Sequence, residues 1–213
     1  MANLESGIKR LGIELTDKQI NSLRVYIKEL KLFNPSYKLV SLRDGASIED
    51  HILDSLSGYK EIKAHLKNDT STIADLGSGA GLPGIPLSIV IPEANFTLIE
   101  RMKRRVGFLN NEILLCGIAD HTIIEEKEVK NVNEKFDIII FRAFRKLIDS
   151  IEEIDKLLNN DGIIIAYKGM LETTQTEVNE LEKKYKNKYK YEIKNYDSFY
   201  TDSERCLLLI SRA

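Results

Sequence analysis

The chain has 213 residues, of which 43% are hydrophobic and 30% are charged, and its formal net charge is −2. This length and composition suit one globular domain with a sizeable core and a small extension. No apolar run approaches the roughly 20 residues that a membrane-spanning helix needs, and no leader with a basic and then an apolar segment is visible. We therefore expect a cytoplasmic protein without a membrane partner. The net charge excludes nucleic-acid binding through an overall basic surface and leaves only local patches for it.

Residues 1–70 are predicted to form a helical extension. Thr16 opens a capping box, and apolar residues recur at helical spacing from Ile20 to Phe33. The Asn34-Pro35 pair is expected to end this helix. A second helix is predicted from about Ser47 to Leu66. No linker rich in glycine, serine and proline follows it, so the extension is expected to pack on the rest of the chain.

Residues 71–213 alternate short apolar runs with amphipathic stretches, which indicates a parallel sheet flanked by helices. The predicted strands are Thr72–Leu76, Phe96–Glu100, His121–Glu125, Phe136–Phe141 and Ile163–Tyr167. The predicted helices are Ile85–Ile91, Lys103–Cys116, Leu147–Leu158 and Leu171–Tyr185. The tetrapeptide Asn159–Gly162 predicts a turn before the fifth strand. Two last runs, Tyr189–Ile193 and Cys206–Ile210, have no helical pattern between them, so they are expected to pair as an antiparallel hairpin.

The strongest local motif is the stretch Ile73–Gly84, which reads IADLGSGAGLPG. A predicted strand ends in an acidic residue, and glycines then open a turn into a helix. Glycines allow unusual backbone dihedrals and let a ligand approach the backbone closely. In an open α/β sheet, a nucleotide-like ligand binds at this place, beyond the carboxyl ends of the strands.

Two cofactors compete for this loop. Residues 79–84 match the dinucleotide fingerprint, and Glu100 lies at a suitable distance to hold a ribose. However, Asp75 and Gly77 precede that match and extend the pattern to Asp-x-Gly-x-Gly-x-Gly. The longer pattern favours S-adenosylmethionine, because a nearby acidic group attracts its sulfonium and would repel a pyrophosphate. A glycine turn without any ligand is the third interpretation.

The string Gly77–Leu87, GSGAGLPGIPL, resembles the signature loop of the bacterial 16S ribosomal RNA guanine-N7 methyltransferases, also called glucose-inhibited division protein B or methyltransferase G of the small subunit. Further segments that resemble this family are HILDSL at 51–56, LIE at 98–100, RRVGFL at 104–109, RAF at 142–144, YKG at 167–169 and Arg205. The resemblance covers nearly the whole chain.

This resemblance implies an α/β, Rossmann-like class I S-adenosylmethionine-dependent methyltransferase, with a seven-stranded sheet that ends in an antiparallel hairpin and a small helical extension before it. It implies S-adenosyl-L-methionine as the cofactor and 16S ribosomal RNA as the partner, within the small subunit or an assembly particle. The implied target is N7 of the 530-loop guanine at position 527. From the loop and the resemblance together, the expected cofactor-binding residues are Asp75, Gly77, Ser78, Gly79, Gly81, Leu82, Glu100, Glu128, Val129 and Arg142.

Residue types at the ends of the other predicted strands limit which atom of a base this protein could methylate. Residues 140–143 lack the Asn/Asp-Pro-Pro-aromatic pattern of enzymes that methylate exocyclic amines. Methylation at C5 of a base needs a cysteine nucleophile, and neither Cys116 nor Cys206 is well placed. Guanine N7 has an accessible lone pair, so alignment and electrostatics suffice for its methylation. The catalytic candidates are Arg142, which would orient cofactor or guanine, and Lys168, which would contact substrate. The alternative is that both pair with nearby carboxylates.

The candidates for RNA binding are His51, Arg101, Lys103, Arg104 and Arg105. The basic run follows Glu100 on the face where RNA would approach, and phosphate contact is expected there, although a solvated helix face has the same pattern. His51 and Asp54 lie three residues apart on one helix, where they line a site or join two layers. No metal is expected, because the histidines and cysteines show no metal-ligand spacing. A nicotinamide-dependent oxidoreductase and a non-catalytic RNA- or nucleotide-binding protein remain alternatives.

Overall fold

A computed structural model describes residues 4–42, 45–68, 70–199 and 204–213. In this part of the chain one sheet has the strand order β3-β2-β1-β4-β5-β7-β6. Its strands are β1 (Thr72–Leu76), β2 (Asn95–Ile99), β3 (Thr122–Glu125), β4 (Phe136–Arg142), β5 (Leu158–Lys168), β6 (Tyr189–Tyr196) and β7 (Arg205–Arg212). Strands β1 to β5 are parallel, whereas β7 runs antiparallel to both β5 and β6. The seven predicted strands and the terminal hairpin are confirmed.

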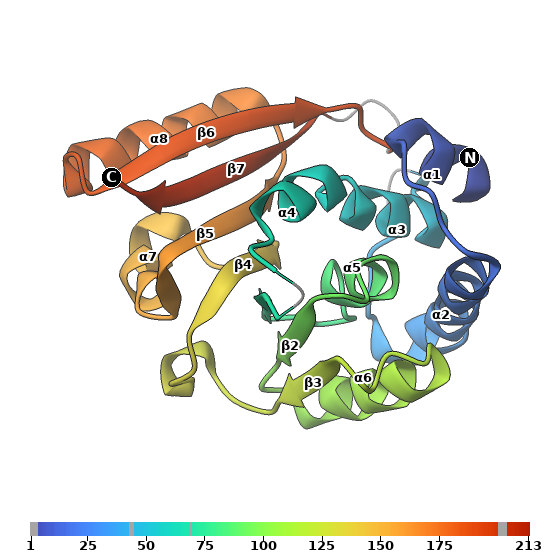
Figure 1. The fold of residues 1–213 in the computed structure, drawn as a ribbon. Coiled ribbons are helices and arrows are strands. Elements are labelled where there is room, and N and C mark those ends of the chain that lie inside the picture. Colours follow the sequence, from blue (N-terminus) through green and yellow to red (C-terminus); the bar gives the residue numbers. More distant parts are fainter. Residues whose placement is uncertain (1–3, 43–44, 69, 200–203) are drawn as a thin grey trace.

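Helices cover both faces of the sheet (Figure 1). The helices are α1 (Leu4–Leu11), α2 (Asp17–Tyr37), α3 (Ile48–Leu56), α4 (Tyr59–His65), α5 (Gly84–Val90), α6 (Lys103–Leu115), α7 (Leu147–Asp155) and α8 (Leu171–Tyr185), with a 3-10 turn η2 at Val129–Asn131. The extension, α5 and α6 pack on one face, and α7 and α8 pack on the other. None of these helices, within the ranges described, is both long and apolar enough to cross a membrane.

The alternation of side chains along the central strands explains why their sequences are almost wholly apolar. In β4, Ile138 and Ile140 join the core beneath the extension, while Ile139 and Phe141 join the core beneath α7 and α8. A strand that is buried on both faces needs apolar residues at successive positions. Because the five strands β1 to β5 are parallel, their carboxyl ends lie at one edge of the sheet. The candidate site described below lies at this edge.

The extension differs from the prediction in two places. Helix α2 does not end at Asn34-Pro35 but continues through Pro35 to Tyr37. Proline removes a single intrahelical hydrogen bond so near a helix end, and the edge-on contact of Phe33 with Tyr37, at 5.2 Å between ring centroids, supports the last turn. The predicted helix 47–66 is interrupted at Gly58, where a Cβ would overlap the Tyr167 hydroxyl.

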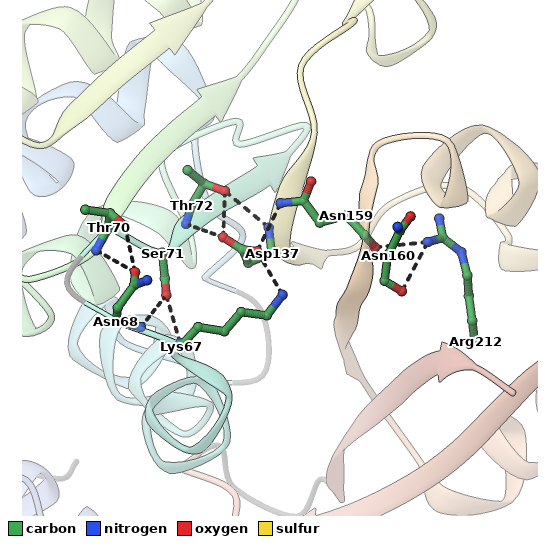
Figure 2. Close-up of polar contacts among 9 residues, drawn as sticks. All are labelled: Lys67, Asn68, Thr70, Ser71, Thr72, Asp137, Asn159, Asn160 and Arg212. Carbon is green, nitrogen blue, oxygen red and sulfur yellow. Dashed lines mark hydrogen bonds and ion pairs between the residues drawn. The ribbon is translucent and has the colours of Figure 1, made fainter.

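The predicted turn at Asn159–Gly162 is wrong, because these residues lie within β5. They form an irregularity in the pairing with β4, where Phe136 pairs with Leu158 but Ile138 pairs with Ile163. Figure 2 shows how polar contacts hold this stretch at the amino-terminal edge of the sheet. Arg212 donates to the carbonyls of Asn159 and Asn160 at 2.9 and 3.4 Å, and the Asn159 amide donates to the Asp137 carboxylate at 3.0 Å. Long-range contacts thus replace the local turn.

Candidate active site at the carboxyl ends of the strands

The glycine loop follows β1 and turns into α5. Gly77, Gly79 and Gly81 have φ values of +68°, +59° and +89°, a region that disfavours residues with a Cβ. The backbone N–H groups of Gly77 and Ser78 both donate to the Ile99 carbonyl, at 2.9 and 3.1 Å, which fixes the loop against the end of β2. At Gly81 a Cβ would also overlap the Ile85 side chain. Both the backbone and the packing therefore require glycine here.

Asp75 and Ser78 stabilise the glycine loop through buried hydrogen bonds. The Asp75 side chain is buried, and its Oδ2 accepts a hydrogen bond of 3.0 Å from the Gly84 N–H. Burial raises the pKa of this carboxyl to about 7. The buried Ser78 hydroxyl donates to the Asp75 carbonyl at 2.9 Å, and Leu82, also buried, continues the turn. These side chains shape the loop, and a direct cofactor contact from Asp75 or Ser78 stays a prediction.

Glu100 forms the second wall of the site, directly after β2. Its carboxylate is 4% exposed, and it accepts hydrogen bonds from the N–H groups of Gly79 at 3.0 Å and Met102 at 2.9 Å. The Arg105 guanidinium lies 3.6 Å from Glu100 Oε2. Since a carboxylate has about four acceptor positions, two backbone donors fix its orientation and leave acceptor capacity for ligand hydroxyls.

The third wall is the end of β4. Ala143 has a positive φ of 52°, and Phe144 then turns back over the loop, where a Cβ at Gly77 would lie 3.2 Å from its ring. Arg142 donates from Nη1 to Asp54 Oδ2 at 3.0 Å. The alternative that Arg142 pairs with a carboxylate is therefore realised, and its partner comes from helix α3 of the extension.

The Asp54 carboxylate lies close to donors from three strands, β4, β6 and β7. Besides Arg142, its buried carboxylate accepts a 2.8 Å hydrogen bond from the Tyr196 hydroxyl and lies 3.7 Å from Arg205 Nε. His51, one turn earlier, has Nε2 2.8 Å from the Ser41 carbonyl oxygen. Burial, and then the positive charge of Arg142, lowers the pKa of His51. Sequence reasoning missed Tyr196, because the predicted strand stopped three residues before it.

Lys168 ends β5 and contacts a different helix. Its Nζ lies 2.6 Å from Glu177 Oε2, and Glu177 Oε1 accepts a hydrogen bond of 3.1 Å from the Leu147 N–H. Glu177 thereby links β5 and α8 to the start of α7. Lys168 is thus also paired with a carboxylate, and substrate contact by this side chain stays a prediction.

The remaining cofactor candidates, Glu128 and Val129, follow β3. Glu128 pairs with Arg101 at 3.2 Å and with Lys130 at 2.7 Å, while Val129 is buried at the start of η2. The ion pair with Arg101 connects this segment to the residues that follow Glu100. The site therefore brings together the glycine loop, Glu100, the segment at 128–129 and the end of β4.

The fold is shared with solved methyltransferases. A ribosomal protein L11 methylase from Lactobacillus delbrueckii has a TM-score of 0.58 at 19% identity, over 78% of this chain and 80% of that one. A precorrin-6y C5,15-methyltransferase from Geobacter metallireducens has a TM-score of 0.56 at 16% identity, over 74% and 88%. The M. jannaschii protein TYW2, in complex with AdoMet, has a TM-score of 0.52 at 17% identity, over 75% and 77%. The expected class I fold is confirmed.

Sequence comparison gives the family. A family model described as rRNA small subunit methyltransferase G matches residues 19–205. A protein named ribosomal RNA small subunit methyltransferase G from Borrelia hermsii is 34% identical, over 84% of this chain and 85% of that protein. A protein of the same name from Treponema denticola is 32% identical, over 98% and 93%. With the fold, these matches confirm S-adenosylmethionine as the cofactor. The chain belongs to the rRNA small subunit methyltransferase G family.

Proposed function

We propose that this protein transfers a methyl group from S-adenosyl-L-methionine to N7 of the 530-loop guanine in 16S ribosomal RNA. The observation that supports this most directly is the buried Glu100 carboxylate, held by the N–H groups of Gly79 and Met102 beside a loop of left-handed glycines. The small-subunit RNA substrate is proposed from the names of the family and of its relatives.

The residues around the loop fit this cofactor. Glu100 is placed to accept both ribose hydroxyls, and the glycines at 77, 79 and 81 leave their backbone open to close approach. Residues 77–84 include no lysine or arginine that could pair with a pyrophosphate, and the Asp75 carboxyl accepts a hydrogen bond from Gly84 in this loop. When bound, the cofactor supplies a methyl group that is attached to a sulfonium. After the transfer, the sulfur remains as a neutral thioether.

The site suits a nucleophile that needs no deprotonation. The N7 lone pair forms the bond to the methyl carbon as the carbon–sulfur bond breaks, so the positive charge moves from sulfur to the guanine ring. A cation without a counter-charge near the sulfur and the guanine would repel this positive charge both before and after the transfer. Arg142 is paired with Asp54, so it can donate hydrogen bonds toward the O6 side of guanine while its charge is balanced.

The two cysteines do not support methylation at a base carbon. Cys116 is buried between α2 and α6, and burial raises the pKa of its thiol to about 12. Cys206 is also buried, where its Sγ lies 3.4 Å from the Gly169 carbonyl, and burial raises its pKa as well. A nucleophilic cysteine must form a thiolate, so neither side chain is suited to attack a base.

The test uses small ribosomal subunits that lack the modification, purified protein and methyl-labelled cofactor. We expect label at N7 of the 530-loop guanine, mapped by reverse transcription, and loss of that label in Glu100→Gln. The exposed Glu172→Gln is the matched control and should behave like the wild type. Label at a different atom or nucleotide would refute the proposed target. Cofactor binding without any transfer would favour a binding protein, and stabilisation by NAD alone would favour an oxidoreductase.

A further inference from the structure

Positive charge is concentrated at the start of α6. Residues 101–111 contain Arg101, Lys103, Arg104 and Arg105 and no acidic residue, whereas the whole chain has a net charge of −2. Arg101 and Arg105 are engaged with Glu128 and Glu100. Among the residues described, no carboxylate lies within 4.0 Å of the Arg104 guanidinium. Within the described part of the chain, Arg104 is therefore the arginine of this run that no carboxylate neutralises, and it is exposed next to residues that contact Glu100.

Two contacts position the exposed Arg104 side chain. Its Nη2 donates to the Ser36 carbonyl at 2.7 Å, and its Cζ lies 4.0 Å from the centroid of the Tyr37 ring. Tyr37 packs edge-on against Phe33, and Phe33 packs on Phe108 at 5.6 Å between centroids. Phe108 belongs to the core. A continuous series of rings therefore leads from the core to a guanidinium at the surface.

A guanidinium fixed over an aromatic ring offers its second flat face to a ligand. RNA-binding proteins recognise unstacked bases by stacking them on aromatic rings or on arginine guanidinium planes, and a cation at the same place favours the adjacent phosphates. Met102, which is 49% exposed, adds apolar surface two residues away. This combination of a flat face, positive charge and apolar surface fits a base of single-stranded RNA.

Arg104 lies close to the residues that contact Glu100 at the cofactor site. Arg105 follows Arg104 directly and contacts Glu100, and Met102 donates its N–H to the same carboxylate. A guanine that reaches a methyl donor beside Glu100 must bring its neighbouring nucleotides past this rim. We propose that Tyr37 and Arg104 form a stacking platform for a base that flanks the target guanine. The platform rests on the proposed function and adds to it a contact from the extension to the RNA.

The critical variant is Arg104→Lys, which keeps the charge but removes the planar group. We measure kcat and KM for unmodified small subunits, together with the Kd for S-adenosylhomocysteine. We expect Arg104→Lys and Arg104→Ala each to raise the KM about 10- to 100-fold, the range that a lost base stack gives. The Kd for S-adenosylhomocysteine should change less than about twofold. Tyr37→Phe keeps the ring and should keep the wild-type KM, whereas Tyr37→Leu should raise it.

The matched control is Lys184→Ala. Lys184 also lies over a tyrosine, with Nζ 4.9 Å from the Tyr185 ring centroid, but at the end of α8 that precedes β6 and thus at the opposite edge of the sheet. A wild-type KM in Arg104→Lys would overturn the platform and leave only a charge effect. A parallel loss of S-adenosylhomocysteine affinity in Arg104→Lys would also overturn the platform. It would mean that Arg104 only stabilises the packing of α2 against α6. If the wild type itself transfers no methyl group to small subunits, the proposed function fails instead.

Discussion

Asp54→Asn tests whether the extension takes part in the chemistry. The Asp54 carboxylate is 2% exposed and lies 3.0 Å from Arg142 Nη1 and 3.7 Å from Arg205 Nε. Breaking a buried ion pair by removing one partner costs about 3–5 kcal/mol. The side chains of Arg142 and Arg205 are 19% and 29% exposed, so water compensates part of this loss. We therefore expect the free energy of unfolding to fall by about 2–3 kcal/mol.

Catalysis should respond in a way that a purely structural role would not produce. S-adenosylmethionine carries a sulfonium cation and S-adenosylhomocysteine a neutral thioether, but the two ligands are otherwise the same. Without the negative charge of Asp54, Arg142 raises the positive potential of the site. Asp54→Asn should therefore weaken binding of S-adenosylmethionine more than binding of S-adenosylhomocysteine, and lower kcat roughly 100-fold, the scale of a displaced positioning group.

The assay is titration calorimetry with both ligands, together with single-turnover methyl transfer and thermal unfolding. Tyr196→Phe is the control, because it removes one hydrogen bond to Asp54 and keeps the charge. It should lose about 1 kcal/mol of stability and keep the wild-type ratio of the two ligand affinities. If Asp54→Asn lowers the melting temperature but leaves kcat and that ratio unchanged, Asp54 only joins the two layers and our reasoning is wrong.

Three other substitutions test single features. Glu100→Gln should weaken S-adenosylhomocysteine binding roughly 10- to 100-fold in calorimetry, since hydrogen bonds to a charged group contribute about 1.5–3 kcal/mol each; unchanged affinity would remove Glu100 from the site. Burial raises the pKa of Glu112 to about 7, so the folded state binds more protons than the unfolded state between pH 4.5 and 7 and loses stability as the pH rises through that window. Glu112→Gln should thus stabilise the protein by up to about 3 kcal/mol in urea unfolding at pH 8, and equal stability there would contradict this. Gly58→Ala should lower the melting temperature by several degrees, because its Cβ would overlap the Tyr167 hydroxyl.

The sheet could be predicted from the sequence because its signals are local. Strand β1 has the predicted bounds Thr72–Leu76, and helix α8 has the predicted bounds Leu171–Tyr185. Each apolar run in the centre of the sheet is buried on both faces, so its composition reports its place directly. The glycine loop was also readable, since the positive φ angles at 77, 79 and 81 need a residue type that is visible in the sequence.

The errors occur where distant residues decide the local structure. The break at Gly58 allows the Tyr167 hydroxyl to donate to the Ser55 carbonyl at 2.6 Å, and this contact joins residues 112 positions apart in the chain. The stretch 159–162 has a strong turn composition, but Arg212 from the last strand satisfies its carbonyls within the sheet. Pairing of Arg142 with a carboxylate was an open alternative, but its partner Asp54 lies 88 positions earlier in the chain and could not be named from the sequence. No pattern within one segment indicates a partner on another segment.

Helices α2 and α3 both make hydrogen bonds to the candidate active site, and a further variant can test whether the site depends on them. Tyr26, fully buried in α2, donates from its hydroxyl to the Ala80 carbonyl at 2.6 Å, inside the glycine loop. Helix α3 supplies Asp54 to Arg142, so two of the three walls depend on residues before 71. Tyr26→Phe leaves the Ala80 carbonyl buried without this donor, which costs about 1–3 kcal/mol. The lost hydrogen bond belongs to the glycine loop itself, so S-adenosylhomocysteine affinity should drop several-fold along with stability.

In Ser22→Ala, which removes a buried hydrogen bond from α2 to Cys116 outside the loop, stability should fall while ligand affinity stays constant. Equal affinities in the two variants would mean that the sheet domain forms its loop without help from the extension.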